Sequence, residues 1–464
     1  MTDPKILHLI NRLSLGPVPG QIQQVENTGI NAYIKAQLQP STIPYSKELK
    51  ENLQYLDTLF LKPGQVVREL RELERQGREL KLDPRSMQKI RRNFEEKIFL
   101  QATRGRLLRA LESPRHLEEM LVDFWYNRFN VFGRNGLNRL FFSSYEQHAI
   151  RPHVLGKFRQ LLGATAKHPA MLLYLDNWQN TAPNSPGVRG NFKGLNENYA
   201  RELLELHTMG VDGGYSQEDV VALARIFTGW GLPHPPLNMT DDDGFYFESD
   251  RHDFSDKVFL GKEIKGRGIA EGEEALDILA NHPATARHIS YKLAEAMVSD
   301  RPPESLVNSM ANRFLETEGN IAEVIDLLFN SSEFWQEKYY NAKFKNPYRF
   351  VVSAMRALGK EVDNFRPING ILNQLGMPLY GCISPDGYAN TKDAWLNSDT
   401  MIRRSSLAVP LAGGLLGRGE PVAAEKLIET LGINFSPTTL EVLANSEGEI
   451  KAALIFGSPE FMRY

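Results

Sequence analysis

Residues 195–230 read LNENYARELLELHTMGVDGGYSQEDVVALARIFTGW, and this stretch decides the fold expected for the chain. On a pitch of about 3.6 residues per turn, Asn198, Glu202 and Glu205 fall on one helical face. Leucines cover much of the remaining surface, so the helix is expected to be substantially buried. The pattern therefore predicts two carboxylates on adjacent turns of a buried helix, where they need partners.

The second half of the stretch predicts another helix packed against the first. Gly210 follows the last periodic residue, and Gly213 and Gly214 supply a turn that tolerates positive φ. Ser216 then offers an N-cap with Asp219 three residues later, ahead of the apolar-periodic segment DVVALARIF. We expect a helix-turn-helix hairpin with acids near its middle.

The composition is that of an ordinary globular protein. The 464 residues are 42% hydrophobic and 24% charged, with a formal net charge of -3. This charge gives no global field for nucleic acid, so a nucleic-acid partner is not expected. The sequence has no run of apolar residues typical of a membrane span or a signal peptide, which favours a cytoplasmic location and leaves a periplasmic one open. Cys382 is the single cysteine, so an internal disulfide is excluded.

Helical periodicity continues through most of the chain and predicts an all-α fold, as a single large domain over residues 1–464. Two regions differ. Between about 64 and 112, mixed charges recur at spacings of three and four, which indicates a charged helical hairpin arm. The arm is either a solvated surface feature or a partner-binding element. Near residues 244–264, alternating apolar positions predict one small β-hairpin.

Several segments together resemble one known family. They are HLINRLSLGPVPGQI, IRPHVLGKFRQLLGATAKHPAMLLYLDN, NENYARELLELHTMGVDGGYSQEDV, ARIFTGW, HDF, HPATARHISYKL and DGYANTKDAWLN, in one order along nearly all of the chain. The chain resembles the uncharacterised bacterial family called domain of unknown function 1800. The resemblance implies no assigned chemistry. It does imply a candidate partner protein, since members are often exported and encoded beside an uncharacterised family, number 1501, that resembles sulfatases and alkaline phosphatases.

The chain departs from that family pattern in one motif. Where similar sequences commonly read FWHNHF, this one reads FWYNRF, with Tyr126 and Arg128 in place of two histidines. A metal-binding role that those histidines would have in relatives is therefore in doubt here.

A metal site is one interpretation of the acidic and histidine residues. A helical-bundle metal centre would favour Glu-x-x-His, but His207 lies two residues beyond Glu205 and points to the opposite side. Imidazole and carboxylate ligands suit a divalent metal such as zinc, iron or manganese. The candidate ligands are His207, His252, Asp253, His168 and His282. Both histidines before proline, His168 and His282, equally fit helix boundaries satisfied by the backbone.

A metal-free enzyme is the second interpretation. Glu202 and Glu205 would act as acid and base on a polar or glycan-like substrate, with burial raising the pKa of one of them. Arg201 and Asp176 are further candidate catalytic residues. The candidate substrate-binding residues are Asn198, Tyr199, Trp178, Trp230 and Arg225, with Tyr215 as a further ring for stacking.

Two non-catalytic alternatives stay open. Glu202 and Glu205 could form a buried ion network with Arg201 or Arg225, since structural networks also perturb pKa values. The whole chain could be a non-catalytic helical scaffold that binds a partner protein through its arm. Sequence spacing alone does not decide between these and an enzyme.

Overall fold

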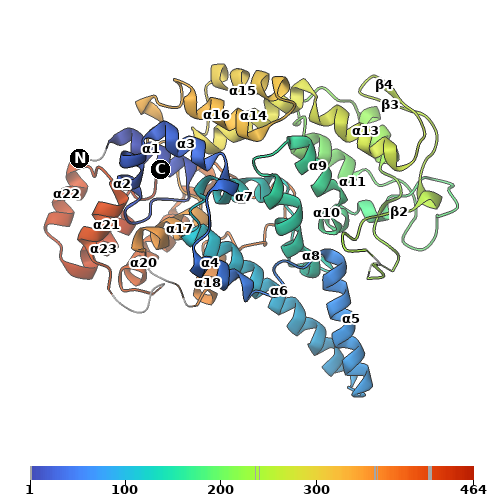
Figure 1. The fold of residues 1–464 in the computed structure, drawn as a ribbon, viewed down its shortest axis with the longest axis horizontal. Coiled ribbons are helices and arrows are strands. Elements are labelled where there is room, and N and C mark those ends of the chain that lie inside the picture. The colour runs from blue at the N-terminus through green and yellow to red at the C-terminus, as the bar shows by residue number, and fades with distance from the viewer. Residues whose placement is uncertain (1–2, 236, 240, 360–361, 363, 416–420) are drawn as a thin grey trace.

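The computed structural model describes residues 3–235, 237–239, 241–359, 362, 364–415 and 421–464, and it confirms the predicted all-α fold class. Helices form an elongated body from which one hairpin projects (Figure 1). Among the described residues, no helix is long and apolar enough to cross a bilayer.

The chain begins with four short helices at one end of the body. They are α1 (Pro4–Leu13), α2 (Gln21–Thr28), α3 (Ile30–Gln37) and α4 (Lys47–Gln54), with the 3-10 turn η1 (Pro40–Thr42) between the last two. Asp3 caps α1 by accepting the Lys5 amide at 2.9 Å, and Pro4 fits the first turn because its missing N–H needs no partner there. Ile10 and Leu13 of α1 are fully buried, so this helix packs on the core through its apolar face.

The predicted charged hairpin is present as α5 (Pro63–Glu79) and α6 (Pro84–Glu112). Its base belongs to the core, where Val67, Leu70, Phe94 and Ile98 are buried. Beyond these residues the two helices extend away from the body (Figure 1). The projecting part is thus shorter than the 64–112 hairpin.

The next group of elements along the chain includes the stretch 195–230. Its elements are α7 (His116–Arg128), α8 (Asn138–Ser144), the π-helix η2 (Tyr145–Ile150), η3 (Arg151–His153), α9 (Phe158–Lys167), α10 (Pro169–Tyr174), η4 (Asn177–Gln179), α11 (Asn198–Glu202), the π-helix η5 (Leu203–His207) and α12 (Gln217–Ile226). The predicted capping box of α12 is confirmed, because Ser216 and Asp219 each accept the other's backbone N–H, at 3.2 and 2.9 Å. The predicted single α-helix is wrong in its second half, because η5 has wider i→i+5 turns.

Strands are few and short. They are β1 (Trp230–Gly231), β2 (Tyr246–Phe247), β3 (Lys257–Phe259) and β4 (Lys262–Ile264), with η6 (Ser249–Arg251) between β2 and β3. A β-hairpin lies within 244–264 as predicted, but it is β3 paired with β4. The other short strand in this region, β2, pairs with β1.

The remaining helices complete the body around α17. They are α13 (Ile269–Ala280), α14 (Pro283–Met297), α15 (Glu304–Glu316), α16 (Ile321–Asn330), η7 (Glu337–Tyr339), α17 (Pro347–Leu358), α18 (Arg366–Gln374), α19 (Lys392–Trp395), α20 (Ser398–Ala412), α21 (Ala424–Leu431), α22 (Pro437–Ala444) and α23 (Gly448–Gly457). Nearly every residue of α17 is buried, as expected for a central helix. The ring of Tyr464 lies 3.6 Å from the Arg349 guanidinium and 4.8 Å from that of Arg12, so both ends of the chain meet beside α17.

Candidate functional site

A cleft of about 360 Å³ opens where α7, η5, α14, the N-terminus of α17 and the loop 381–391 converge. Its polar lining consists of Asp123, Asn127, Arg128, Glu205, His288, Lys292, Glu295, Asn346, Arg349, Asp386, Asn390 and Thr391, with the phenol ring of Tyr464. Both signs of charge face the cleft, which suits a polar ligand better than an apolar one.

Asn127, near the end of α7, clamps the loop that carries Asp386. Its Nδ2 donates to the Tyr388 carbonyl and its Oδ1 accepts the Tyr388 amide, both at 2.8 Å. Gly387, which precedes Tyr388, has φ +75°. A Cβ on Gly387 would lie 2.2 Å from the backbone carbonyl oxygen of Asn127. Only glycine allows this close approach.

Asn130 fixes the other end of the same loop. Its Nδ2 donates to the carbonyls of Cys382 at 3.1 Å and Ser384 at 2.8 Å. Since Asp386 lies between the two clamped points, the backbone that carries it is held at the cleft by Asn127 of α7 and by Asn130, just beyond the end of α7.

Arg128 ties α7 to the two other walls of the cleft. It donates to the Leu206 carbonyl in η5 and lies 3.0 Å from Nε2 of His288 in α14. A guanidinium only donates, so Nε2 of His288 accepts and the ring is neutral. Burial and the charge of Arg128 accordingly lower the pKa of His288 to about 3.

Three carboxylates lie near enough to interact electrostatically, and two of them, Glu205 and Asp386, line the cleft. Burial, then the charges of Glu205 and Asp386, raise the pKa of Glu202 above its usual range. Arg201 lies 3.6 Å from Glu205 and 3.1 Å from Glu197. Because the Arg201 side chain is partly exposed, solvent weakens its attraction, and it offsets only part of the negative charge of the three carboxylates. The raised pKa means that Glu202 holds its proton to a higher pH than an ordinary glutamate does.

The cleft has a rigid floor. Asp123 accepts from Arg106 at 2.6 Å, and Arg106 also donates to the buried Glu146 at 3.0 Å. Glu146 accepts further hydrogen bonds from Arg151 at 3.1 Å and the Tyr380 hydroxyl at 2.8 Å. A charged network with this many partners holds its members in fixed positions.

A family model matches residues 8–463. The chain belongs to the family described as a protein of unknown function (DUF1800). No curated protein and no solved structure matches it.

Four of the seven segments by which this DUF1800 member resembles its family contribute residues to the cleft. They supply Leu15, Glu205, Leu206, Val211, His288, Lys292 and the lining residues from Asp386 to Thr391. Sequence reasoning selected Glu205 but not Arg128, His288, Lys292 or Asp386. The motifs FWYNRF and DGYANTKDAWLN were the signal for Arg128 and Asp386.

The residues predicted beside Glu205 divide between the cleft and the core. Glu202 and Arg201 are its neighbours. Asn198 turns away and donates to the Leu175 carbonyl at 3.2 Å. Asp176 is exposed after α10 with φ 57°, outside the cleft lining.

The predicted aromatic platform is in the interior. Trp230 is fully buried and Tyr199 is 1% exposed, and both rings pack edge-on against Phe227. Trp178 packs on Phe192 and offers its carbonyl to Arg251 at 2.6 Å. A buried ring has no free face for a sugar, so Trp230 and Tyr199 act as core residues here.

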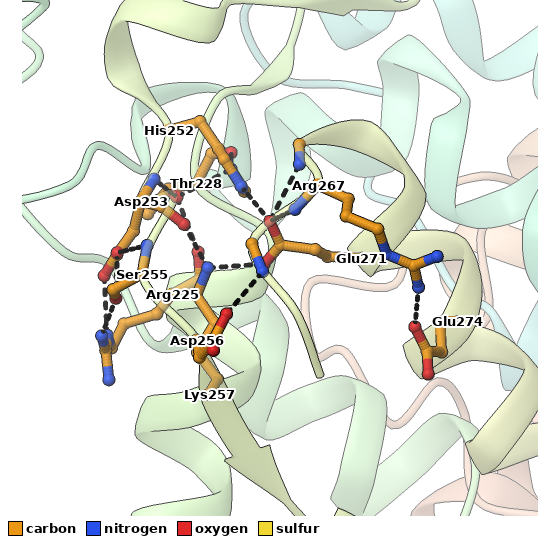
Figure 2. A network of polar contacts seen from close by, with 12 residues as sticks. Arg225, Thr228, His252, Asp253, Ser255, Asp256, Lys257, Arg267, Glu271 and Glu274 are labelled. Atoms are coloured by element: carbon orange, nitrogen blue, oxygen red, sulfur yellow. Dashed lines mark hydrogen bonds and ion pairs between the residues drawn. The ribbon is translucent and has the colours of Figure 1, made fainter. Parts of the chain in front are cut away.

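A second predicted group lies away from the cleft, around Glu271 (Figure 2). Glu271 accepts from His252 Nε2 at 2.9 Å and from Lys257 at 2.5 Å. Arg225 donates to Asp253 at 2.7 Å. Burial alone would raise the pKa of Glu271, but the hydrogen bonds from His252 and Lys257 outweigh it and hold that pKa below the usual range.

The predicted metal ligands are not brought together. His168 and His282 each accept the backbone N–H two residues on, at 3.1 and 3.2 Å, as expected for helix boundaries. His207 is buried against Phe129, and burial, Arg128 and His288 lower its pKa to about 3. Within the described ranges, no group of three or more His, Cys, Asp or Glu could hold a metal ion.

The two departures from the family motif have different surroundings. Tyr126 is buried, and its hydroxyl lies 3.4 Å from the Val131 carbonyl. The Arg128 guanidinium occupies the space at His288 Nε2, where it presents only N–H donors. Position 128 of this chain therefore offers no metal ligand.

Proposed function

We propose that this protein is an enzyme that performs acid–base chemistry on a polar substrate bound in the cleft. Glu202 would supply the proton, and Glu205 and Asp386, which line the cleft, would act as bases beside it. The observation that carries the proposal is that Glu205 and Asp386 both line the cleft and that their charges, after burial, raise the pKa of the neighbouring Glu202. Titratable groups whose environments separate their pKa values are the usual basis of acid–base catalysis.

The cationic side of the cleft supports a substrate with polar or negatively charged oxygen atoms. Arg349 is buried, and one of its nitrogens donates to the carbonyls of Asn11 and Ser14. Its Nε has no hydrogen-bond partner in the described structure. Lys292, on α14, lines the same cleft. These cations would orient the substrate while the carboxylates move protons.

The test is a screen of the purified protein against phosphate esters, carboxylic esters and glycosides, followed by variants. Glu205→Gln and Asp386→Asn should each lower kcat by about 10²- to 10⁴-fold on any substrate found, the range of a lost general acid or base. Glu26→Gln, an exposed acid on α2, is the matched control and should retain the parent rate. Turnover unchanged in Glu205→Gln and Asp386→Asn would refute the proposal.

A further inference from the structure

The distal part of the α5–α6 hairpin, residues 75–92, is called here the arm tip. At its base Gly77 lets the helices touch, since a Cβ there would lie 2.6 Å from Met87 and 2.9 Å from Ile90. The Leu82 amide donates to the Gly77 carbonyl at 3.1 Å and closes the connection. The result is a slender finger that stands clear of the body (Figure 1).

The arm tip is strongly basic in an acidic protein. Residues 75–92 contain seven Lys and Arg against two Asp and Glu, a net charge of +5. Because the whole chain carries -3, the rest of it carries -8. Lys81, Arg85, Lys89 and Arg92 are all exposed. Arg75, Arg78 and Arg91 form ion pairs with acids of the same hairpin, so Lys81, Arg85, Lys89 and Arg92 are the cations that remain for a partner of opposite sign.

The arm tip also exposes apolar side chains at its apex. Leu80 is 74% exposed and Leu82 39% exposed, on either side of Lys81. Exposed leucines beside basic residues are the composition of elements that lie in the interface of a lipid bilayer.

We propose that the arm tip docks the protein onto an anionic lipid surface. Leu80 and Leu82 enter the interface, and the surrounding Lys and Arg side chains pair with lipid phosphate and carboxylate groups. A convex finger of this kind cannot supply the roughly 800 Å² per partner of a stable protein interface. Nucleic-acid backbones bind basic residues but do not require exposed leucines. A lipid surface uses both features.

The length of the arm fits the charge of the body. Beyond the buried Leu70, α5 continues for the nine residues 71–79, about 13.5 Å at a rise of about 1.5 Å each. The projecting part therefore exceeds the Debye length of about 8 Å at physiological salt. The acidic body is screened from the surface that the arm tip binds.

The test is sedimentation of the full chain with vesicles of zwitterionic lipid alone or of an equal mixture with anionic lipid. Binding to the anionic vesicles only is expected. The variant Lys81→Gln/Arg85→Gln/Lys89→Gln should weaken it on the order of a hundredfold, at about fivefold for each charge. Leu80→Ser should weaken it about tenfold, the effect of one leucine left in water.

Matched variants on the body keep the result specific. Lys47→Gln/Lys50→Gln/Lys262→Gln removes three exposed charges, and Ile402→Ser removes an apolar side chain of similar exposure, 66%. Both should bind vesicles like the parent, with circular dichroism confirming that all variants fold. Equal binding to zwitterionic vesicles, absence of binding, or equal losses in the body variants would overturn the proposal. So would a Leu80→Ser variant that binds like the parent while nucleic acid displaces the vesicles.

Discussion

Glu202 in the cleft and Glu271 in the network of Figure 2 are both partly or fully removed from water, yet their surroundings shift their pKa values in opposite directions. Glu271 accepts hydrogen bonds from His252 and the Lys257 ammonium, and from two backbone N–H groups, those of Arg267 at 2.7 Å and Gly268 at 2.9 Å. Glu202 instead experiences the negative charges of two further acids, Glu205 and Asp386. A buried acid with a full set of donors stabilises a fold, whereas an acid held among other acids is kept at a cost to stability.

The largest expected loss of stability comes from removing the Glu271 carboxylate. Glu271→Ala should lower the free energy of unfolding by about 3–5 kcal/mol, because the Lys257 ammonium remains buried without its counter-charge. Urea denaturation measures the change. The control is Glu274→Ala, whose pair with Arg267 is partly exposed and should contribute less than about 1 kcal/mol. Equal losses in the two variants would mean that the network is not the structural element described.

Glu271 and Glu202 should make the stability of the fold depend on pH in opposite directions. The pKa of Glu271 lies below its ordinary value of 4.5, so its contribution is present above pH 4.5 and is lost as the pH falls through the lowered pKa. The pKa of Glu202 lies above 4.5, so its contribution is present below pH 4.5 and is lost as the pH rises through the raised pKa.

Unfolding measured over a pH series on the parent, Glu271→Gln and Glu202→Gln tests this. The advantage of the parent over Glu271→Gln should shrink below pH 4.5. Relative to Glu202→Gln, the parent should lose stability above pH 4.5. Parallel curves for all three proteins would contradict the assigned environments.

The smallest expected change in stability comes from neutralising Glu205, which lines the cleft. Glu205→Gln removes a negative charge that faces Glu202 and Asp386, so stability should stay the same or rise by roughly 0.5 kcal/mol. Thermal unfolding of this variant beside Asp253→Asn provides the comparison, because Asp253 accepts from Arg225 and should lose stability when neutralised. A large loss in Glu205→Gln would support the alternative in which Glu205 is part of a structural ion network.

Local features of the fold could be predicted from the sequence because their causes are local. Helical periodicity gave the fold class, and the cap of α12 followed from Ser216 and Asp219. His168 and His282 behave as helix-boundary residues because each has a proline next to it and an amide within reach.

The cleft could not be predicted because its parts are distant in the chain. Asn127 clamps Tyr388 across 261 residues, and Arg128 reaches His288 across 160. No periodicity within one segment reports such contacts. The sequence could not place Trp230 and Tyr199 in the core for a related reason. An aromatic ring near an acidic helix has the same local sequence pattern whether it faces a ligand or the core.

The π-helix η5 makes Glu205 sensitive to insertions and deletions. Within Leu203–His207, Glu205 lines the cleft and His207 enters the core against Phe129. Each residue of an α-helix turns the chain by about 100°, and each residue of a π-helix by less, so a deletion of one residue here would rotate the later side chains of η5 about the helix axis. A substitution in η5 therefore alters one side chain. A change in the length of η5 would instead change which residues face the cleft and which face the core.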